Sequence, residues 1–284
     1  MKALVDQMAR RWFRRQAEKQ PVRRPALITS RYDRDAAELD AIWRAEPNRF
    51  FAPLNITPDP WQRSVFLSDA PRQLLLCTRQ GGKSTAAGAR AVRVALTVPR
   101  SLILVLSPTQ RQAGEFFKDK VKPFYNALGR PVRAVNETTS SLDLANGSRL
   151  IALPDNEAGI RGFSGARLIV VDEASRVSDD LYRAVLPMLA ISGGALLALS
   201  TPYGKRGWFF EEWDKGETWD RVMVTADECP RISPAFLLEQ QARMGARWFR
   251  QEFYCSFEDA IDAVFMQSDI DAMFAGGAQV EPLW

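Results

Sequence analysis

The sequence predicts an α/β fold in which a central, mostly parallel β-sheet is flanked by helices. Uninterrupted apolar runs of four or five residues predict strands that are buried on both faces, as is typical of parallel sheets. Stretches with helical spacing separate these runs along the chain. The 284 residues are 46% hydrophobic and 25% charged, which is ordinary for a globular protein with a substantial core.

The region through residue 50 has the spacing of one or two amphipathic helices, interrupted by prolines at 21–25. Through Arg31 it carries nine Lys and Arg against two acids, which gives +7, whereas the remainder is about −3. Two interpretations stay open: a solvated tail, or an arm that contacts DNA or a protein partner.

After this region, Asp59 as N-cap and Pro60 as first helical residue predict the start of a helix. Strands and helices then alternate. The predicted strands are 74–77, 102–106, 168–171, 195–199 and 222–225. The predicted helices are 83–98, 110–128, 179–189, 233–244 and one ending near 254. Asn146-Gly147 predicts a hairpin between 141–145 and 148–153.

Composition excludes several classes of chemistry. The chain has no histidine, which removes Ser-His and Cys-His catalysis and most zinc sites. Its three cysteines form no CxxC pair and are interpreted as reduced thiols. No apolar run is long enough for a membrane span, and no secretory signal follows the basic N-terminus.

The segment Cys77–Thr85 carries the first chemical motif. Gly82-Lys83-Ser84 matches the second half of the pattern G-x-x-x-x-G-K-[ST], but Cys77 stands at the first glycine. Between a buried strand and a helix, such a loop can cradle phosphates with backbone N–H groups, with Lys83 and Ser84 reaching phosphate and Mg²⁺. The alternative is an ordinary glycine turn before a helix.

Two further motifs follow buried strands. Asp172-Glu173 ends one of them, as a Walker B pair in which Asp172 holds Mg²⁺ and Glu173 polarises the attacking water. The alternative is a pair of N-capping acids. Ser200-Thr201-Pro202 ends another, where hydroxyl groups can sense a γ-phosphate, unless this is only a capping turn. Since all these motifs follow parallel strands, we expect them at one sheet edge.

Together these motifs resemble the viral terminase large subunits, the ATPases that package double-stranded DNA. The loop Arg79-Gln80-Gly81-Gly82-Lys83-Ser84, without the usual first glycine, is similar to their phosphate loop. Similar segments elsewhere are Ile160-Arg161-Gly162, Val171-Asp172-Glu173-Ala174, Ser200-Thr201-Pro202 and Gln251-Glu252-Phe253-Tyr254-Cys255. The resemblance covers about residues 59–265 and implies a RecA/ASCE-like P-loop NTPase fold with an N-terminal helical arm and a small C-terminal helical lid.

The resemblance also implies roles for single residues. Gln62 matches a glutamine that contacts adenine, and Arg79 matches a loop arginine acting as an arginine finger, in cis or towards a neighbouring subunit. Arg161 is a possible sensor, trans-acting arginine or DNA contact. The remaining implied residues are the ATP-binding Gln80, Gly81, Gly82, Lys83, Ser84 and Thr85, the metal ligands Ser84 and Asp172, the catalytic Glu173, Arg79 and Lys83, and the coupling residues Ser200, Thr201 and Pro202.

The implied function is an ATP-hydrolysing motor that uses ATP and Mg²⁺ to drive double-stranded DNA into a procapsid. The implied partners are DNA, the portal protein, the small terminase subunit and further copies in a ring, with a monomer in solution and host cytoplasm as the location. We expect a basic arm at 1–50, an ATPase core at 51–227 and a helical lid or linker at 228–284.

The resemblance has a boundary at the C-terminus. Terminase large subunits usually carry a nuclease domain, for which the few residues after Phe265 are too short, so we expect no DNA cleavage. This fits either an excised ATPase domain or a naturally split or truncated protein. Two alternative functions stay open: a helicase or recombination-type P-loop translocase, and a nucleotide-binding assembly module that hydrolyses nothing.

Overall fold

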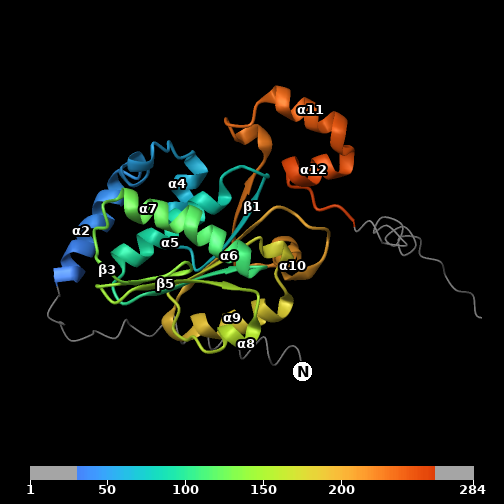
Figure 1. Cartoon of the computed structure of the whole chain (residues 1–284). Helices are drawn as coiled ribbons and strands as arrows, with labels where there is room; N and C mark the ends of the chain where they lie inside the picture. Colours follow the sequence, from blue (N-terminus) through green and yellow to red (C-terminus); the bar gives the residue numbers. More distant parts are fainter. Residues whose placement is uncertain (1–30, 260–284) are drawn as a thin grey trace, which may run out of the picture.

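A computed structural model describes residues 31–259 of the chain. Its centre is an eight-stranded sheet with the order β3-β4-β5-β2-β6-β7-β1-β8 (Figure 1). Five of the seven strand pairings are parallel, and only β3–β4 and β4–β5 are antiparallel. The mostly parallel sheet predicted from the apolar runs is thereby confirmed. The strands are β1 Arg72–Cys77, β2 Leu102–Ser107, β3 Ala134–Glu137, β4 Ser141–Leu144, β5 Arg149–Pro154, β6 Leu168–Asp172, β7 Ala195–Ser200 and β8 Asp220–Val224.

Two layers of helices cover the two faces of this sheet (Figure 1). The first layer is α2 Arg31–Ala45, α3 Asn48–Phe51, α4 Pro60–Leu67, α5 Lys83–Thr97, α6 Gln110–Phe116 and α7 Lys122–Ala127. The second is α8 Glu157–Ile160, α9 Asp179–Ser192 and α10 Gly207–Lys215. The pair α11 Pro234–Met244 and α12 Ala246–Tyr254 lies beyond the end of β1 (Figure 1). Short 3-10 turns are Ala52–Leu54, Ala174–Arg176 and Ala226–Glu228.

Successive side chains of the central strands point to opposite faces of the sheet, which divides the hydrophobic core into two clusters. In β1, Leu75 and Cys77 pack in the cluster under α2–α7, whereas Leu74 and Leu76 pack in the cluster with α8–α10. The interior strands β1, β2, β6 and β7 are therefore almost fully buried, as the continuous apolar runs require. The edge strand β8 is mostly exposed.

The structure differs from the predicted elements in several places. The helix predicted over 110–128 is split by a π-helical turn, Phe117–Val121. This turn lies just before Pro123. Because proline has no N–H, the carbonyl four residues before it lacks its helical donor. The mostly exposed edge strand β3 lacks an apolar run and was not predicted. Neither α3 nor α10 was predicted as a helix.

The expected boundary at residue 50 crosses a continuous core. Trp43 of α2 is buried and meets Phe50 edge-to-face at 5.0 Å, and both belong to the cluster around α5. Residues 31–50 are thus packed on the sheet domain, while the part of the expected arm at 1–30 lies outside the described residues. The three-segment division stays a prediction. No helix within 31–259 is long and apolar enough to cross a membrane.

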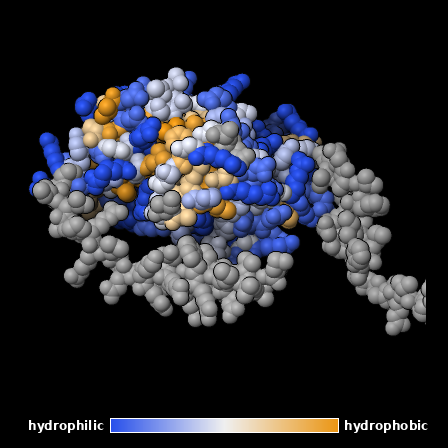
Figure 2. Space-filling view, turned by 90° about the horizontal axis from the view of Figure 1, so that it is seen from below, coloured by the Kyte–Doolittle hydropathy of each residue, from blue (hydrophilic) through white to orange (hydrophobic). Residues whose placement is uncertain are grey.

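The face on the α8–α9 side is largely hydrophilic, with hydrophobic residues gathered near its middle (Figure 2). A shallow cleft of about 490 Å³ opens on this side of the fold, lined by Phe163, Pro187 and Met188 with charged neighbours.

Candidate active site

The loop between β1 and α5 makes a tight turn without the usual first glycine. Cys77 is the last residue of β1 and pairs with Val224 of β8, so a buried thiol continues the strand where the glycine would stand. The turn then needs left-handed backbone at Gln80 (φ 59°) and Gly82 (φ 91°). A Cβ at Gly81 would lie 2.8 Å from Cys77 Sγ, so this position has no room for a side chain.

Lys83 is the first residue of α5 and is buried at the base of this loop. Its Nζ lies 3.0 Å from Glu173 Oε1. Burial lowers the pKa of Lys83, but the charges of Glu173 and Asp172 outweigh that effect, so the pKa is raised and the ammonium form is kept. A buried cation at the start of a helix is suited to hold phosphate.

Asp172 and Ser84 meet although β6, which ends at Asp172, is not adjacent in the sheet to β1, which leads into the loop before Ser84. Asp172 ends β6, which β7 separates from β1. Ser84 Oγ donates to Asp172 Oδ1 at 3.2 Å. Burial and the neighbouring Glu173 raise the pKa of Asp172 to about 6. A hydroxyl and a carboxylate oxygen side by side form the hard donor set that Mg²⁺ prefers.

The backbone turns away from β6 at Glu173. This residue adopts left-handed angles (φ 52°, ψ 44°), an uncommon conformation that costs about 1 kcal/mol or more for a residue with a side chain. The expectation that two adjacent acids divide their roles fits this geometry, because Asp172 reaches Ser84 while Glu173 reaches Lys83.

Arg79 is held by the C-terminal helix pair. Its Nη1 lies 3.3 Å from Glu252 Oε2 of α12, and its backbone N–H donates to the Glu252 carbonyl at 2.9 Å. The hydroxyl of Thr78 donates to the same carbonyl at 3.3 Å. The Arg79 side chain is 64% exposed and that of Glu252 only 6%, so a buried carboxylate anchors an exposed cation at the cleft.

Gln62 and Arg231 bond to the backbone of the phosphate loop, and Asp59 links these two residues. Gln62 accepts the Asp59 N–H at 2.9 Å and donates to the Gly82 carbonyl at 3.3 Å. Arg231 pairs with both oxygens of Asp59, at 3.0 and 2.7 Å, and donates to the Gly81 carbonyl at 2.9 Å. Gln62 is thus placed beside the loop, with its amide engaged by the helix cap and the loop backbone.

The Ser200-Thr201-Pro202 segment is connected to the turn that follows Glu173. The hydroxyls of Ser175 and Ser200 are 2.6 Å apart, and Ser175 Oγ also donates to the Thr201 carbonyl at 2.9 Å. Ser200 is buried, whereas Thr201 lines the cleft. Ser175 therefore connects the turn after Glu173 directly to this segment.

Some of these side chains line a polar cleft of about 370 Å³. It is lined by Arg79, Lys83, Gln112, Glu173, Arg176, Thr201 and Glu252. Three cations and two carboxylates line it, so a polyanion would replace the internal carboxylate partners of Lys83 and Arg79. Within residues 31–259 no group of three or more Asp, Glu, Cys or His could hold a metal ion. Ser84 and Asp172 would need further oxygen ligands, such as phosphate and water, to complete a Mg²⁺ site.

Arg161 does not line this cleft. It is exposed and lies at the separate α8–α9 cleft with Phe163, Asp180 and Arg183. Thr85 is in the first turn of α5, beside Ser84.

The sequence reasoning missed Arg231, Glu252, Ser175 and Arg176 as site residues. Glu252 lies in a segment that was compared with the family, but nothing local marks it as a partner of Arg79, 173 residues away. Arg176 stacks over Tyr203 at 4.1 Å. Ser175, two residues after Glu173, was the one that the sequence could have suggested.

Residues 74–272 match the protein family described as terminase large subunit, T4likevirus-type, N-terminal. Comparison with curated protein sequences gave no match. Among solved structures, the large terminase ATPase domain of Thermus phage P74-26 is 21% identical with a TM-score of 0.63, covering 74% of this chain and 98% of that one.

Two larger structures are also similar in fold. The large terminase of thermophilic bacteriophage D6E in complex with ADP is 13% identical, with a TM-score of 0.58 over 70% of this chain and 54% of that one. The HK97 bacteriophage large terminase is 15% identical, with a TM-score of 0.56 over 70% and 50%. The chain thus spans about half the length of these two proteins.

Proposed function

Because the chain belongs to the terminase large subunit family, as an N-terminal ATPase domain, we propose that its cleft binds ATP with Mg²⁺ and hydrolyses it to drive double-stranded DNA into a procapsid. The observation that carries the proposal is the meeting of four groups from two distant motifs. Lys83 Nζ lies 3.0 Å from Glu173, and Ser84 Oγ lies 3.2 Å from Asp172. The RecA/ASCE-like P-loop fold and the terminase resemblance are confirmed; the roles of single residues belong to the proposal.

The geometry supports the following division of roles. The loop N–H groups and Lys83 bind the β- and γ-phosphates, and Ser84 and Asp172 hold Mg²⁺. When bound, Mg²⁺ offsets the charge that develops on the phosphate oxygens. As Lys83 turns to phosphate it releases Glu173, which then accepts a proton from the attacking water.

Arg79 and the coupling segment complete the proposed cycle. Phosphate at the cleft mouth attracts Arg79 away from Glu252, and the arginine then offsets charge on the transferred phosphoryl group. Because Glu252 lies on α12, this exchange alters the contact between the loop and the helical lid. The bonds of Ser175 to Ser200 and Thr201 provide a second connection, from Glu173 to the coupling segment.

The partners and location follow from the family and are part of the proposal. We propose that copies form a ring on the portal protein with the small terminase subunit, are monomeric in solution, and work in the host cytoplasm. We further propose that Arg161, which is exposed and lies outside the ATP cleft, acts as a sensor, as a trans-acting arginine or as a DNA contact. We also propose that this ATPase domain does not itself cleave DNA.

The direct test is steady-state ATP turnover of the full chain with and without duplex DNA, with Lys83→Ala as the loss control. We expect slow turnover by the isolated chain, faster turnover with duplex DNA, and none above background in the variant. ATP binding without turnover would instead support the assembly module. Stimulation by single-stranded DNA but not by duplex would support the helicase-type translocase, which the family match does not favour.

A further inference from the structure

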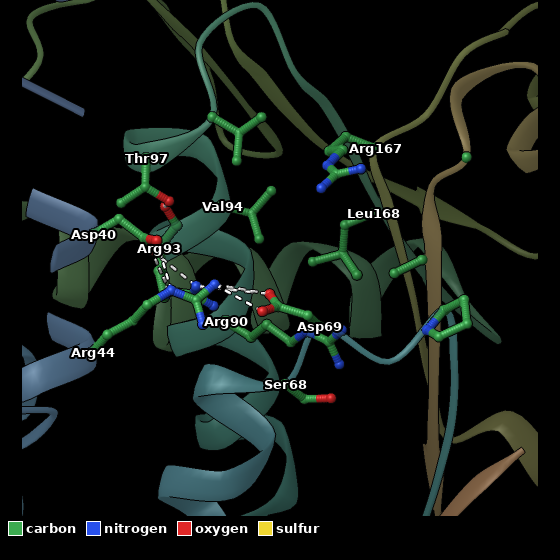
Figure 3. A pocket seen from close by; sticks show the side chains of 14 residues that line it. Asp40, Arg44, Ser68, Asp69, Arg90, Arg93, Val94, Thr97, Arg167 and Leu168 are labelled. Carbon is green, nitrogen blue, oxygen red and sulfur yellow. Dashed lines mark hydrogen bonds and ion pairs between the residues drawn. The ribbon is translucent and has the colours of Figure 1, made fainter. Parts of the chain in front are cut away.

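A second charged cavity lies at the opposite edge of the sheet, where β1, β6 and β7 begin (Figure 3). Its volume is about 300 Å³, and its walls come from α2, the second half of α5 and the segments that lead into these strands. The charged side chains that line it are Asp40, Arg44, Asp69, Arg90, Arg93 and Arg167. Four arginines and two aspartates leave this cavity with a net charge of +2.

The two aspartates are bound to only two of the arginines. Asp40 Oδ1 accepts from Nη2 and Nε of Arg93 at 2.8 and 3.0 Å, and its Oδ2 accepts from Arg44 at 2.7 Å. Asp69 takes both of its short contacts, 3.0 and 2.9 Å, from Arg44 (Figure 3). Arg44 and Arg93 are therefore neutralised within the cavity wall.

Arg90 is buried with neutral partners. It is 2% exposed and donates to the side-chain oxygen of Gln73 at 2.9 Å and to the Ala70 carbonyl at 3.4 Å. No carboxylate of residues 31–259 is hydrogen bonded to it. Burial lowers the pKa of Arg90 to about 10, because removal from water disfavours the charged form. A desolvated guanidinium gains strongly from a nearby anion.

Arg167 supplies the second unneutralised charge. It directly precedes β6 and reaches the cavity from the side opposite Arg44 and Arg93 (Figure 3). Its side chain is exposed and makes no hydrogen bond or ion pair with the described part of the chain. Since it supports no internal contact, this arginine is free to bind a ligand at no cost to packing.

We propose that this cavity is a phosphate site, which binds inorganic phosphate or a phosphate monoester between Arg90 and Arg167. The net charge of +2 matches the charge of about −1.5 to −2 on a phosphate monoester near neutral pH better than the single charge of a carboxylate. Arginine forks suit phosphate oxygens because they offer paired N–H donors. A cavity of about 300 Å³ has room for a phosphate group beside Arg90, which is almost fully buried.

A purely structural account of the cavity makes a different prediction. In that account Gln73, which donates to Asp220 at 2.7 Å, relays the Asp220 charge to Arg90 and completes the network without a ligand. Arg167 would then be an ordinary surface arginine. Phosphate would have no effect that depends on Arg167.

The experiment measures binding of inorganic phosphate by calorimetry and by its effect on Tm. It uses the full chain carrying Lys83→Ala, which weakens phosphate binding at the catalytic loop. Adding Arg167→Gln should weaken the remaining binding at least about tenfold, because a paired, charge-assisted contact is lost. Arg183→Gln, which changes an exposed arginine of α9, should leave it unchanged. Equal phosphate affinity with and without Arg167→Gln, or no binding in the Lys83→Ala chain, would overturn the proposal.

The source of the phosphate is resolved in a second arm. A short DNA oligonucleotide with a 5′-phosphate is compared with the same oligonucleotide lacking it, in both variants. A contribution of the 5′-phosphate that disappears with Arg167→Gln identifies a nucleic-acid end as the ligand. Equal binding of the two oligonucleotides, beside Arg167-dependent binding of inorganic phosphate, identifies the free ion.

Discussion

The parallel strands end at one side of the sheet, its carboxyl edge, and begin at the opposite side, its amino edge. Both edges carry clusters of cations and carboxylates, but the charges are arranged for different tasks. At the carboxyl edge, Lys83 and Arg79 are each paired with one carboxylate, Glu173 and Glu252, across an open cleft. At the amino edge, Asp40 is shared between Arg44 and Arg93 inside the packing of α2 against α5. Pairs of the first kind can be exchanged for a ligand, whereas breaking the second kind leaves a buried charge without its partner.

The largest effect is expected at the carboxyl edge. Replacing Glu173 by Gln removes the carboxylate that accepts the proton of the attacking water but keeps the side-chain shape. We expect kcat for ATP hydrolysis to fall about 10²–10⁴-fold, with nucleotide binding retained, because general bases contribute on this scale. Turnover of Glu211→Gln, an exposed acid on α10, should match the unmodified chain. Undiminished turnover in Glu173→Gln would remove this residue from the catalytic role.

The second-largest effect is expected on the stability of the fold, when the Asp40–Arg93 pair at the amino edge is broken. Asp40→Asn leaves Arg93, 3% exposed, without its close carboxylate. Breaking a fully buried pair costs about 3–5 kcal/mol, and because the Asp40 side chain is 27% exposed, we expect a loss of about 2 kcal/mol in the free energy of unfolding. Chemical denaturation measures this loss. Asp180→Asn, which breaks an exposed pair, should change the free energy by under about 0.5 kcal/mol.

The same pair gives a dependence on pH. Burial raises the pKa of Asp40, but hydrogen bonds and charges from Arg44 and Arg93 outweigh it, so the pKa lies below its ordinary value. The stabilisation is therefore present above the ordinary pKa of aspartate and is lost as pH falls through the lower, folded value. The difference between Asp40→Asn and the unmodified chain should shrink over that acidic range. A difference that stays constant with pH would assign the loss to packing.

The sequence predicts residues of a site when they lie close together along the chain, and it misses those that are far apart. Lys83, Ser84, Asp172 and Glu173 lie in two short motifs beside buried strands, so local patterns were enough to find them. Glu252 and Arg231 reach the loop from helices and turns more than 140 residues later, and only the folded chain brings them there.

The prediction of secondary structure was likewise limited to elements with a local sequence pattern. The interior strands were predicted because their burial on both faces leaves continuous apolar runs. The exposed strand β3 has no such run, and the π turn before Pro123 keeps the spacing of an ordinary helix. Arg90 and Arg93 of the amino-edge cavity are one helical turn apart on α5, but no spacing relates them to Arg44 of α2 or to Arg167 just before β6.

The third prediction concerns Gln62, which belongs to both the fold and the candidate site. Its two hydrogen bonds close a capping box at Asp59 and hold the Gly82 carbonyl. We expect Gln62→Ala to cost about 1 kcal/mol, or about 2–4 °C in Tm. If Gln62 also contacts adenine, the variant should lose preference for ATP over GTP in competition binding. A fall in Tm with unchanged preference would restrict Gln62 to bracing the loop.

The smallest effect tests whether the carboxyl-edge pairs are exchangeable. Glu252→Gln keeps a side-chain oxygen near Arg79 but removes the charge that competes with phosphate for it. Because Arg79 is 64% exposed, the pair is worth only about 0.5–1 kcal/mol, which predicts that a non-hydrolysable ATP analogue binds about 2–5-fold tighter. The gain should shrink as salt concentration rises, since added ions screen the same charge. Weaker binding of the analogue in Glu252→Gln would mean that Glu252 holds Arg79 ready for phosphate and does not compete with it, and α12 would then be a fixed wall of the site.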